Sequence, residues 1–154
     1  MAGSIADIRK NYTQQSLSEN DAEVNPIQQF SKWWDEAVAS DIDEVNAMTL
    51  ATASSDGIPS ARIVLLKEYD INGFTFFTNY NSFKGQQLAE NPKACLVFFW
   101  KELERQVRIT GLIEKISPAA SDEYFNSRPQ GSQVGAIASP QSQVIENREW
   151  LDNH

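Results

Sequence analysis

The stretch "SARIVLLK", Ser60–Lys67, decides the fold prediction, because it sets four consecutive aliphatic residues between two cations. An apolar run this short and this rich in branched side chains is typical of a β-strand covered on both faces. Arg62 and Lys67 are five residues apart, so in a regular strand they point to opposite faces and lie roughly 16 Å apart. One small anion cannot contact both. The stretch therefore predicts a buried strand with a separate cation at each end.

The composition is that of one soluble globular domain: 154 residues, of which 41% are hydrophobic and 22% charged. A single cysteine excludes an internal disulfide and a cysteine-based metal site. Together with a single histidine at the last position, it argues for a reducing, cytoplasmic setting and against a histidine-based triad or a zinc site. We expect no membrane span and no signal peptide, because long apolar runs are missing. The net charge of −8 argues against nucleic-acid binding.

The charge is unevenly distributed along the chain. Residues 62–128 carry a net charge of +1, whereas the rest of the chain carries −9. This distribution is consistent with cations reserved for a small anionic ligand. It is equally consistent with ordinary scatter between acidic helices at the two ends.

The pattern of elements predicts an α+β, mainly β, protein built on a small β-barrel with helices at both ends. We expect a mobile arm over residues 1–25 and a folded domain over 26–154. The predicted strands are 47–54, 60–69, 74–79, 93–100 and 105–116, and the predicted helices are 26–40, 82–91, 117–128, 131–139 and 139–154. The last helix ends without a cap, so we expect the natural protein to be longer.

No motif predicts a catalytic side chain or a metal ligand, so a cofactor would have to perform any chemistry. The chain instead offers cations, hydroxyls and amides near the ends of elements, which are the donors that bind a phosphate. This set comprises Arg62, Lys67, Thr78, Lys84, Gln106, Arg108, Tyr124, Arg128 and Ser132. Each of them alone is more often an ordinary surface residue, so the residues by themselves support only a small barrel with a candidate anion site.

Four motifs in order make a specific resemblance: "ARIVLLK", "FFTNYNSFKGQQLAENP", "RQVRITGLIEKI" and "YFNSRPQGSQVGAIASPQS". Together with "IRKNY" in the arm, they closely resemble the pyridoxamine 5′-phosphate oxidase family. The resemblance implies an FMN-binding split β-barrel and a homodimer, with FMN in clefts between the subunits. It also implies oxidation of pyridoxamine or pyridoxine 5′-phosphate to pyridoxal 5′-phosphate, a vitamin B6 reaction, with O2 as acceptor and hydrogen peroxide as product.

The resemblance also implies roles for individual residues. Arg62 and Lys84 would contact the FMN phosphate. The flavin would be held by Ile63, Val64, Leu65, Leu66, Phe77, Thr78 and Gln106, and by Gln141 and Ser142 of the other subunit. The substrate phosphate would be bound by Lys67, Tyr124, Arg128 and Ser132, while Arg9 and Tyr12 of the arm would close over the substrate.

Two departures from the family pattern bear on this expectation. Phe83 stands where relatives commonly carry a second basic residue, which removes one phosphate donor. The family's C-terminal tryptophan and Arg-x-His segment are absent from this sequence. Two alternatives therefore stay open: a related split-barrel flavoprotein with another substrate, and a flavin-binding or structural dimer without catalysis.

Overall fold

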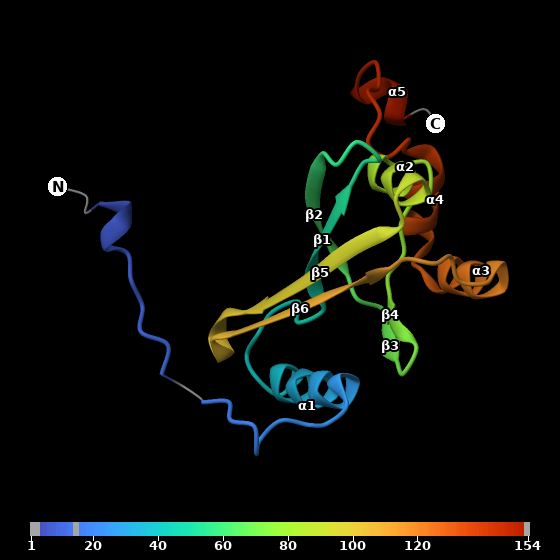
Figure 1. Ribbon diagram of the computed structural model, residues 1–154. Helices are drawn as coiled ribbons and strands as arrows, with labels where there is room; N and C mark the ends of the chain where they lie inside the picture. The colour runs from blue at the N-terminus through green and yellow to red at the C-terminus, as the bar shows by residue number, and fades with distance from the viewer. Residues whose placement is uncertain (1–3, 14–15, 153–154) are drawn as a thin grey trace. The chain divides into compact units, whose positions relative to one another are not determined.

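The computed structural model describes residues 4–13 and 16–152, which fall into two compact units (Figure 1). The N-terminal unit comprises the residues up to Val45 together with Phe98–Val107. The C-terminal unit comprises Asn46–Val97 together with the residues from Arg108 onward. All cavities discussed below belong to the C-terminal unit.

Within the described residues the strands and helices come in groups along the chain: four strands follow the first α-helix, two more follow the second, and three helices come last. The strands are β1 (Ala47–Ala53), β2 (Pro59–Leu65), β3 (Glu68–Asp70), β4 (Gly73–Thr75), β5 (Lys93–Trp100) and β6 (Arg105–Leu112). The helices are α1 (Pro26–Val38), α2 (Phe83–Glu90), α3 (Pro118–Ser127), α4 (Gln130–Ala138) and α5 (Arg148–Asp152), with 3-10 turns at Ile5–Asp7 and Lys101–Leu103.

The strands form a four-stranded sheet in the order β2-β1-β5-β6 and a two-stranded sheet of β3 and β4. β1 pairs antiparallel with both β2 and β5, and β3 pairs antiparallel with β4. The α+β class and the antiparallel succession predicted from the sequence are confirmed. Met48, Leu50 and Thr52 of β1 are buried, as are Ala94 and Leu96 of β5, and the register sets Leu50 opposite Leu96 and Thr52 opposite Ala94. They form the buried face of the sheet.

A tight hairpin fixes the register between β1 and β2. Ser54 and Ile58 close the loop, and Gly57 adopts a φ of +87°, a left-handed conformation that glycine reaches without steric cost. The resulting register sets Leu50 opposite Arg62 and Thr52 opposite Ser60. Because opposite residues share a face, Ser60 and Arg62 lie on the buried face of the sheet.

The stretch Ser60–Lys67 differs from the prediction in that it is not one continuous strand. The predicted strand 60–69 is divided, because the Leu66 amide bonds to Asn46 and the Lys67 amide bonds to Thr75 beside the second sheet. Lys67 is therefore not at the end of the strand that holds Arg62. Within this chain one face of β2 is open, since Ile63 is 64% exposed. The covering of that face by the flavin cleft and a second subunit stays a prediction.

Other predicted boundaries were too long. The strand predicted over 74–79 ends at Thr75, and the one predicted over 105–116 ends at Leu112. The helix predicted over 139–154 is confirmed only at Arg148–Asp152, because residues 139–147 form turns; the last two residues lie outside the described part of the chain.

The N-terminal unit is built around an aromatic cluster. Phe30 of α1 lies 5.4 Å from Phe98 and 6.0 Å from Trp100, measured between ring centroids. All three side chains are almost completely buried. α1 begins at an Asn25 cap, with Pro26 in its first turn.

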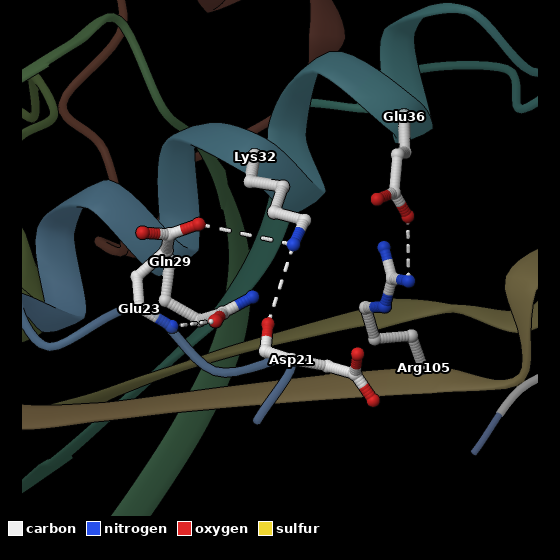
Figure 2. A network of polar contacts seen from close by, with 6 residues as sticks. All are labelled: Asp21, Glu23, Gln29, Lys32, Glu36 and Arg105. Carbon is white, nitrogen blue, oxygen red and sulfur yellow. Dashed lines mark hydrogen bonds and ion pairs between the residues drawn. The ribbon is translucent and has the colours of Figure 1, made fainter. Parts of the chain in front are cut away.

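Polar contacts fasten α1 to the segments around it (Figure 2). Arg105, at the start of β6, makes a 2.7 Å ion pair with Glu36 and lies 4.9 Å from the Trp33 ring. Lys32 contacts Glu23 and the Asp21 carbonyl oxygen. Glu104, the neighbour of Arg105, contacts Lys10 and accepts a hydrogen bond from the Thr13 amide. The arm therefore contacts its own unit through Glu104, while its mobility stays a prediction.

Within residues 4–13 and 16–152, no helix has the length and apolar character needed to cross a membrane.

α2 approaches the preceding turn so closely that only glycine fits at its third position. A Cβ added at buried Gly85 would clash with the Tyr80 carbonyl oxygen and lie 2.8 Å from that of Asn79. We expect Gly85→Ala to lower the free energy of unfolding by about 2 kcal/mol, because backbone must move to accommodate the methyl group. Urea denaturation measures this change. Gly131→Ala, in α4 with open space around it, is the matched control; an equal loss in both variants would contradict the close approach at Gly85.

Candidate functional site

Two adjoining cavities in the C-terminal unit contain most of the predicted site residues. The smaller cavity has a volume of about 310 Å³ and the larger one of about 930 Å³. Ile63, Lys84 and Gln141 line both of them. The larger volume is in the range of cofactor and ligand sites in proteins.

The smaller cavity contains two cations that are held by neutral groups. Arg62 donates to the Leu50 carbonyl oxygen at 3.1 Å, to Thr52 Oγ1 at 2.7 Å and to Ser60 Oγ at 2.5 Å. Lys84 donates to Gln141 Oε1 at 2.9 Å and to Ser82 Oγ at 3.4 Å. In the described part of the chain neither cation has an acidic partner within ion-pair distance. Their charge is therefore available to an anion.

Burial affects the protonation of both cations. It lowers the pKa of Arg62, which still remains protonated at neutral pH. Burial also lowers the pKa of Lys84, and the positive charge of Arg62 lowers it further. An anion bound beside both cations would offset the repulsion that disfavours the protonated form of Lys84.

The other residues that line the smaller cavity carry no charge. Phe83, 54% exposed, lies where a third cation was expected from the family pattern. Gln141 and Ser142 complete the lining. Within this one chain they already lie beside Lys84 and Arg62, and their predicted role across a subunit interface stays a prediction.

The larger cavity contains a stacked aromatic pair and further cations, among them Lys67 and Arg128. Phe77 stacks on Tyr124 with ring centroids 3.6 Å apart, and Lys67 Nζ lies 5.9 Å from the Tyr124 centroid. Residues predicted on the flavin side and on the substrate side are thus in contact. The predicted residues that line this cavity are Ile63, Val64, Leu65, Lys67, Phe77, Thr78, Lys84, Tyr124, Arg128, Ser132 and Gln141.

The helices α3 and α4 and the turn between them position Arg128 and Ser132 in the larger cavity. Arg128 caps α3, and Ser132 lies in the first turn of α4. The Gln133 side chain donates to the carbonyl oxygens of Arg128 at 2.8 Å and Asn126 at 3.2 Å, which holds the turn closed. Arg128 and Ser132 therefore enter the cavity from a fixed backbone.

Thr78 provides the cavity with an unused hydrogen-bonding group. Its Oγ1 is buried and has no hydrogen-bond partner among the residues that the structure describes. A buried hydroxyl is rarely left unpaired, because losing its bond to water has a cost of about 1–3 kcal/mol. The unpaired group, the two free cations and the aromatic pair fit a ligand that combines a phosphate with a planar ring, as FMN does.

Four predicted residues are not brought to these cavities. Leu66 is 4% exposed and lines neither cavity; its backbone pairs with Asn46. Gln106, Arg9 and Tyr12 belong to the N-terminal unit and are exposed. Arg108, one of the possible phosphate donors, is also exposed and lines neither cavity.

Sequence reasoning missed the groups that hold Arg62. Ser60 and Gln87 lie within quoted stretches and Thr52 does not, but none of the three was predicted to have a role. The signal that could have found two of them is the hairpin at Gly57, because its register places Thr52 opposite Ser60 and next to Arg62.

A family profile and individual relatives of similar sequence point to the same family. The family profile described as pyridoxamine 5′-phosphate oxidase matches residues 34–153. A pyridoxine/pyridoxamine 5′-phosphate oxidase of Nostoc punctiforme is 59% identical over 152 residues, which are 99% of this chain and 71% of the relative. The enzyme of the same name from Polynucleobacter asymbioticus is 60% identical over 149 residues, covering 97% of this chain and 71% of the relative.

Solved structures give a consistent result for the fold. PhzG from Burkholderia lata, solved with tetrahydrophenazine-1-carboxylic acid, has a TM-score of 0.85 and 30% identity over 90% of this chain and 70% of its own. A pyridoxamine 5′-phosphate oxidase-related, FMN-binding protein of Nostoc punctiforme has a TM-score of 0.63 and 15% identity, over 85% of this chain and 73% of its own. These likenesses confirm the predicted fold class, that of the FMN-binding split barrels.

The lowered pKa of Lys84 predicts how anion binding depends on pH. Between about pH 8 and 10 phosphate stays a dianion, while Lys84 begins to lose its proton below the ordinary lysine value of 10.5. We expect the affinity for inorganic phosphate, measured by NMR titration, to fall over this range because one positive charge is lost. In Lys84→Arg the charge persists, so the affinity should stay level. An equal decline in both proteins would contradict the role of Lys84.

Proposed function

Because the chain belongs to the pyridoxamine 5′-phosphate oxidase family, we propose that it is an FMN-dependent oxidase of pyridoxamine or pyridoxine 5′-phosphate. The proposed product is pyridoxal 5′-phosphate, with O2 as acceptor and hydrogen peroxide as the second product. One observation carries the proposal beyond family membership: Arg62 and Lys84 share a cavity, and within the described part of the chain their hydrogen-bond partners are all neutral.

In this proposal the smaller cavity binds the phosphate of FMN through Arg62 and Lys84. The apolar wall of Ile63, Val64 and Leu65 and the ring of Phe77 would hold the flavin, and Thr78 would donate its unused hydroxyl proton to it. Bound FMN supplies the redox chemistry, since it accepts a hydride and passes electrons to O2. The protein contributes orientation and the exclusion of water, and no side chain is proposed as a catalytic residue.

The other end of the larger cavity would bind the phosphate of the substrate. Lys67 and Arg128 provide positive charge there, while Tyr124 and Ser132 provide hydroxyls. Arg and Lys beside two hydroxyls are suited to a dianionic phosphate. The contact between Phe77 and Tyr124 makes the two proposed subsites neighbours, as a reaction between flavin and substrate requires.

A second candidate is a related flavoprotein that acts on a different ring system. PhzG, at 30% identity and a TM-score of 0.85, was solved with tetrahydrophenazine-1-carboxylic acid, which carries a carboxylate and no phosphate. The cation pair of Lys67 and Arg128 favours the phosphate-bearing substrate. A purified protein that binds FMN and oxidises neither vitamin B6 phosphate would favour the second candidate.

We also propose that the functional form is a homodimer. Ile63 is 64% exposed although it lies beside both cavities, and the edge of β2 is open within this chain. A second subunit would cover this edge. Gln106, Arg9 and Tyr12 keep their proposed roles, in flavin and substrate binding, within that assembly.

Arg128→Ala separates substrate binding from cofactor binding. Arg128 lines only the larger cavity, so its loss should raise the KM for pyridoxamine 5′-phosphate by tenfold or more, equivalent to about 1.5–3 kcal/mol for one charge-assisted contact. The Kd for FMN, measured by quenching of flavin fluorescence, should change by less than about twofold because the Arg62 and Lys84 contacts remain.

Arg108→Ala is the matched control, since Arg108 is exposed on β6 and lines neither cavity. This variant removes the same charge and should alter neither the KM for pyridoxamine 5′-phosphate nor the Kd for FMN. An unchanged KM in Arg128→Ala, or an equal rise in both variants, would contradict the proposed substrate subsite.

A further inference from the structure

The contacts of Arg62 continue into a buried network that ends on α2. Thr52 Oγ1 and Ser60 Oγ, which accept from Arg62, each lie 2.6 Å from Gln87 Oε1. Thr52 is 4% exposed and Gln87 is 3% exposed. Arg62 is therefore linked to α2 through two hydroxyls, that of buried Thr52 and that of half-buried Ser60.

The chemistry of the donors fixes the direction of the bonds that Arg62 and Gln87 make in this network; the 3.3 Å contact between Thr52 Oγ1 and Ser60 Oγ has no fixed direction. A guanidinium can only donate, so both hydroxyl oxygens accept from Arg62 and must direct their own protons elsewhere. Gln87 Oε1 receives both protons, which leaves its amide nitrogen away from the hydroxyls. That nitrogen, Nε2, has no hydrogen-bond partner among the described residues.

The identity of the acceptor matters because of its charge. A glutamate at position 87 could accept the same two hydroxyl protons, but it would add a negative charge one hydroxyl away from Arg62. An anion in the cavity would then compete with that carboxylate. Glutamine accepts both bonds and leaves the charge of Arg62 uncompensated.

We propose that Gln87 is a positioning residue that holds Arg62 through Thr52 and Ser60 while keeping it electrically free for the phosphate of the cofactor. The inference rests on the proposed function, because FMN is the ligand to which it applies. Gln87 lines neither cavity, so it acts through Arg62 and not by contact.

Gln87→Glu tests the charge requirement with an isosteric change. At pH 8 the variant should bind FMN about tenfold more weakly than the wild type, because the new carboxylate offsets Arg62. As the pH falls, the carboxyl becomes protonated and is again a neutral acceptor, so the ratio of the two Kd values should return toward one. Taking the ratio at each pH removes the titration of the FMN phosphate itself.

Gln86→Glu is the matched control, because it adds the same charge at the next position of α2, where the side chain is exposed. Its Kd ratio should stay within about twofold of one at every pH, since exposed charges are screened by solvent. A pH-independent ratio for Gln87→Glu, or a ratio equal to that of Gln86→Glu, would overturn the inference.

A second readout needs no FMN. The guanidinium N–H signals of Arg62 in the NMR spectrum report its hydrogen bonds, and they should broaden in Gln87→Leu and stay sharp in Gln86→Glu. Unchanged Arg62 signals in Gln87→Leu would contradict the positioning role even where FMN binds normally. If the wild-type protein binds no FMN while the Arg62 signals still broaden in Gln87→Leu, the proposed function is refuted and the role of Gln87 stands.

Discussion

The structure depends on keeping a cation partly buried without an acidic partner. Arg62 lies at the edge of the buried face of the sheet, where removal from water disfavours its charge. Three neutral acceptors compensate by hydrogen bonding: the Leu50 carbonyl oxygen and the hydroxyls of Thr52 and Ser60. A carboxylate would hold the guanidinium more strongly, but it would also occupy the charge that an anionic ligand needs.

The rest of the C-terminal unit can be understood from this requirement. The hairpin at Gly57 sets the register that brings Thr52 and Ser60 to Arg62. The close approach at Gly85 brings α2 against the preceding turn, and α2 carries Lys84, the second cation. Fold and site are thus connected through two glycines: Gly57 lines neither cavity, and Gly85 lies in the wall of the larger one.

Much of the fold and of the candidate site could be predicted from the sequence. Apolar periodicity and capping residues located nearly every element, and the resemblance to a family selected cavity residues such as Arg62, Lys84 and Arg128. The break between Leu66 and Lys67 could not be predicted, because an unbroken apolar run does not reveal that its amides pair with two different sheets. The buried network of Gln87 was also missed, since a buried glutamine in a short helix is indistinguishable from a solvated one in sequence.

The central claim is that Arg62 and Lys84 bind the phosphate of a flavin, and comparing FMN with riboflavin tests it most directly. The two ligands share the ring system and differ in the phosphate. Two charge-assisted contacts predict that the Kd for FMN is lower than the Kd for riboflavin by about a hundredfold or more. Both constants are measured by flavin fluorescence on the purified protein. Equal affinities for FMN and riboflavin would contradict the account.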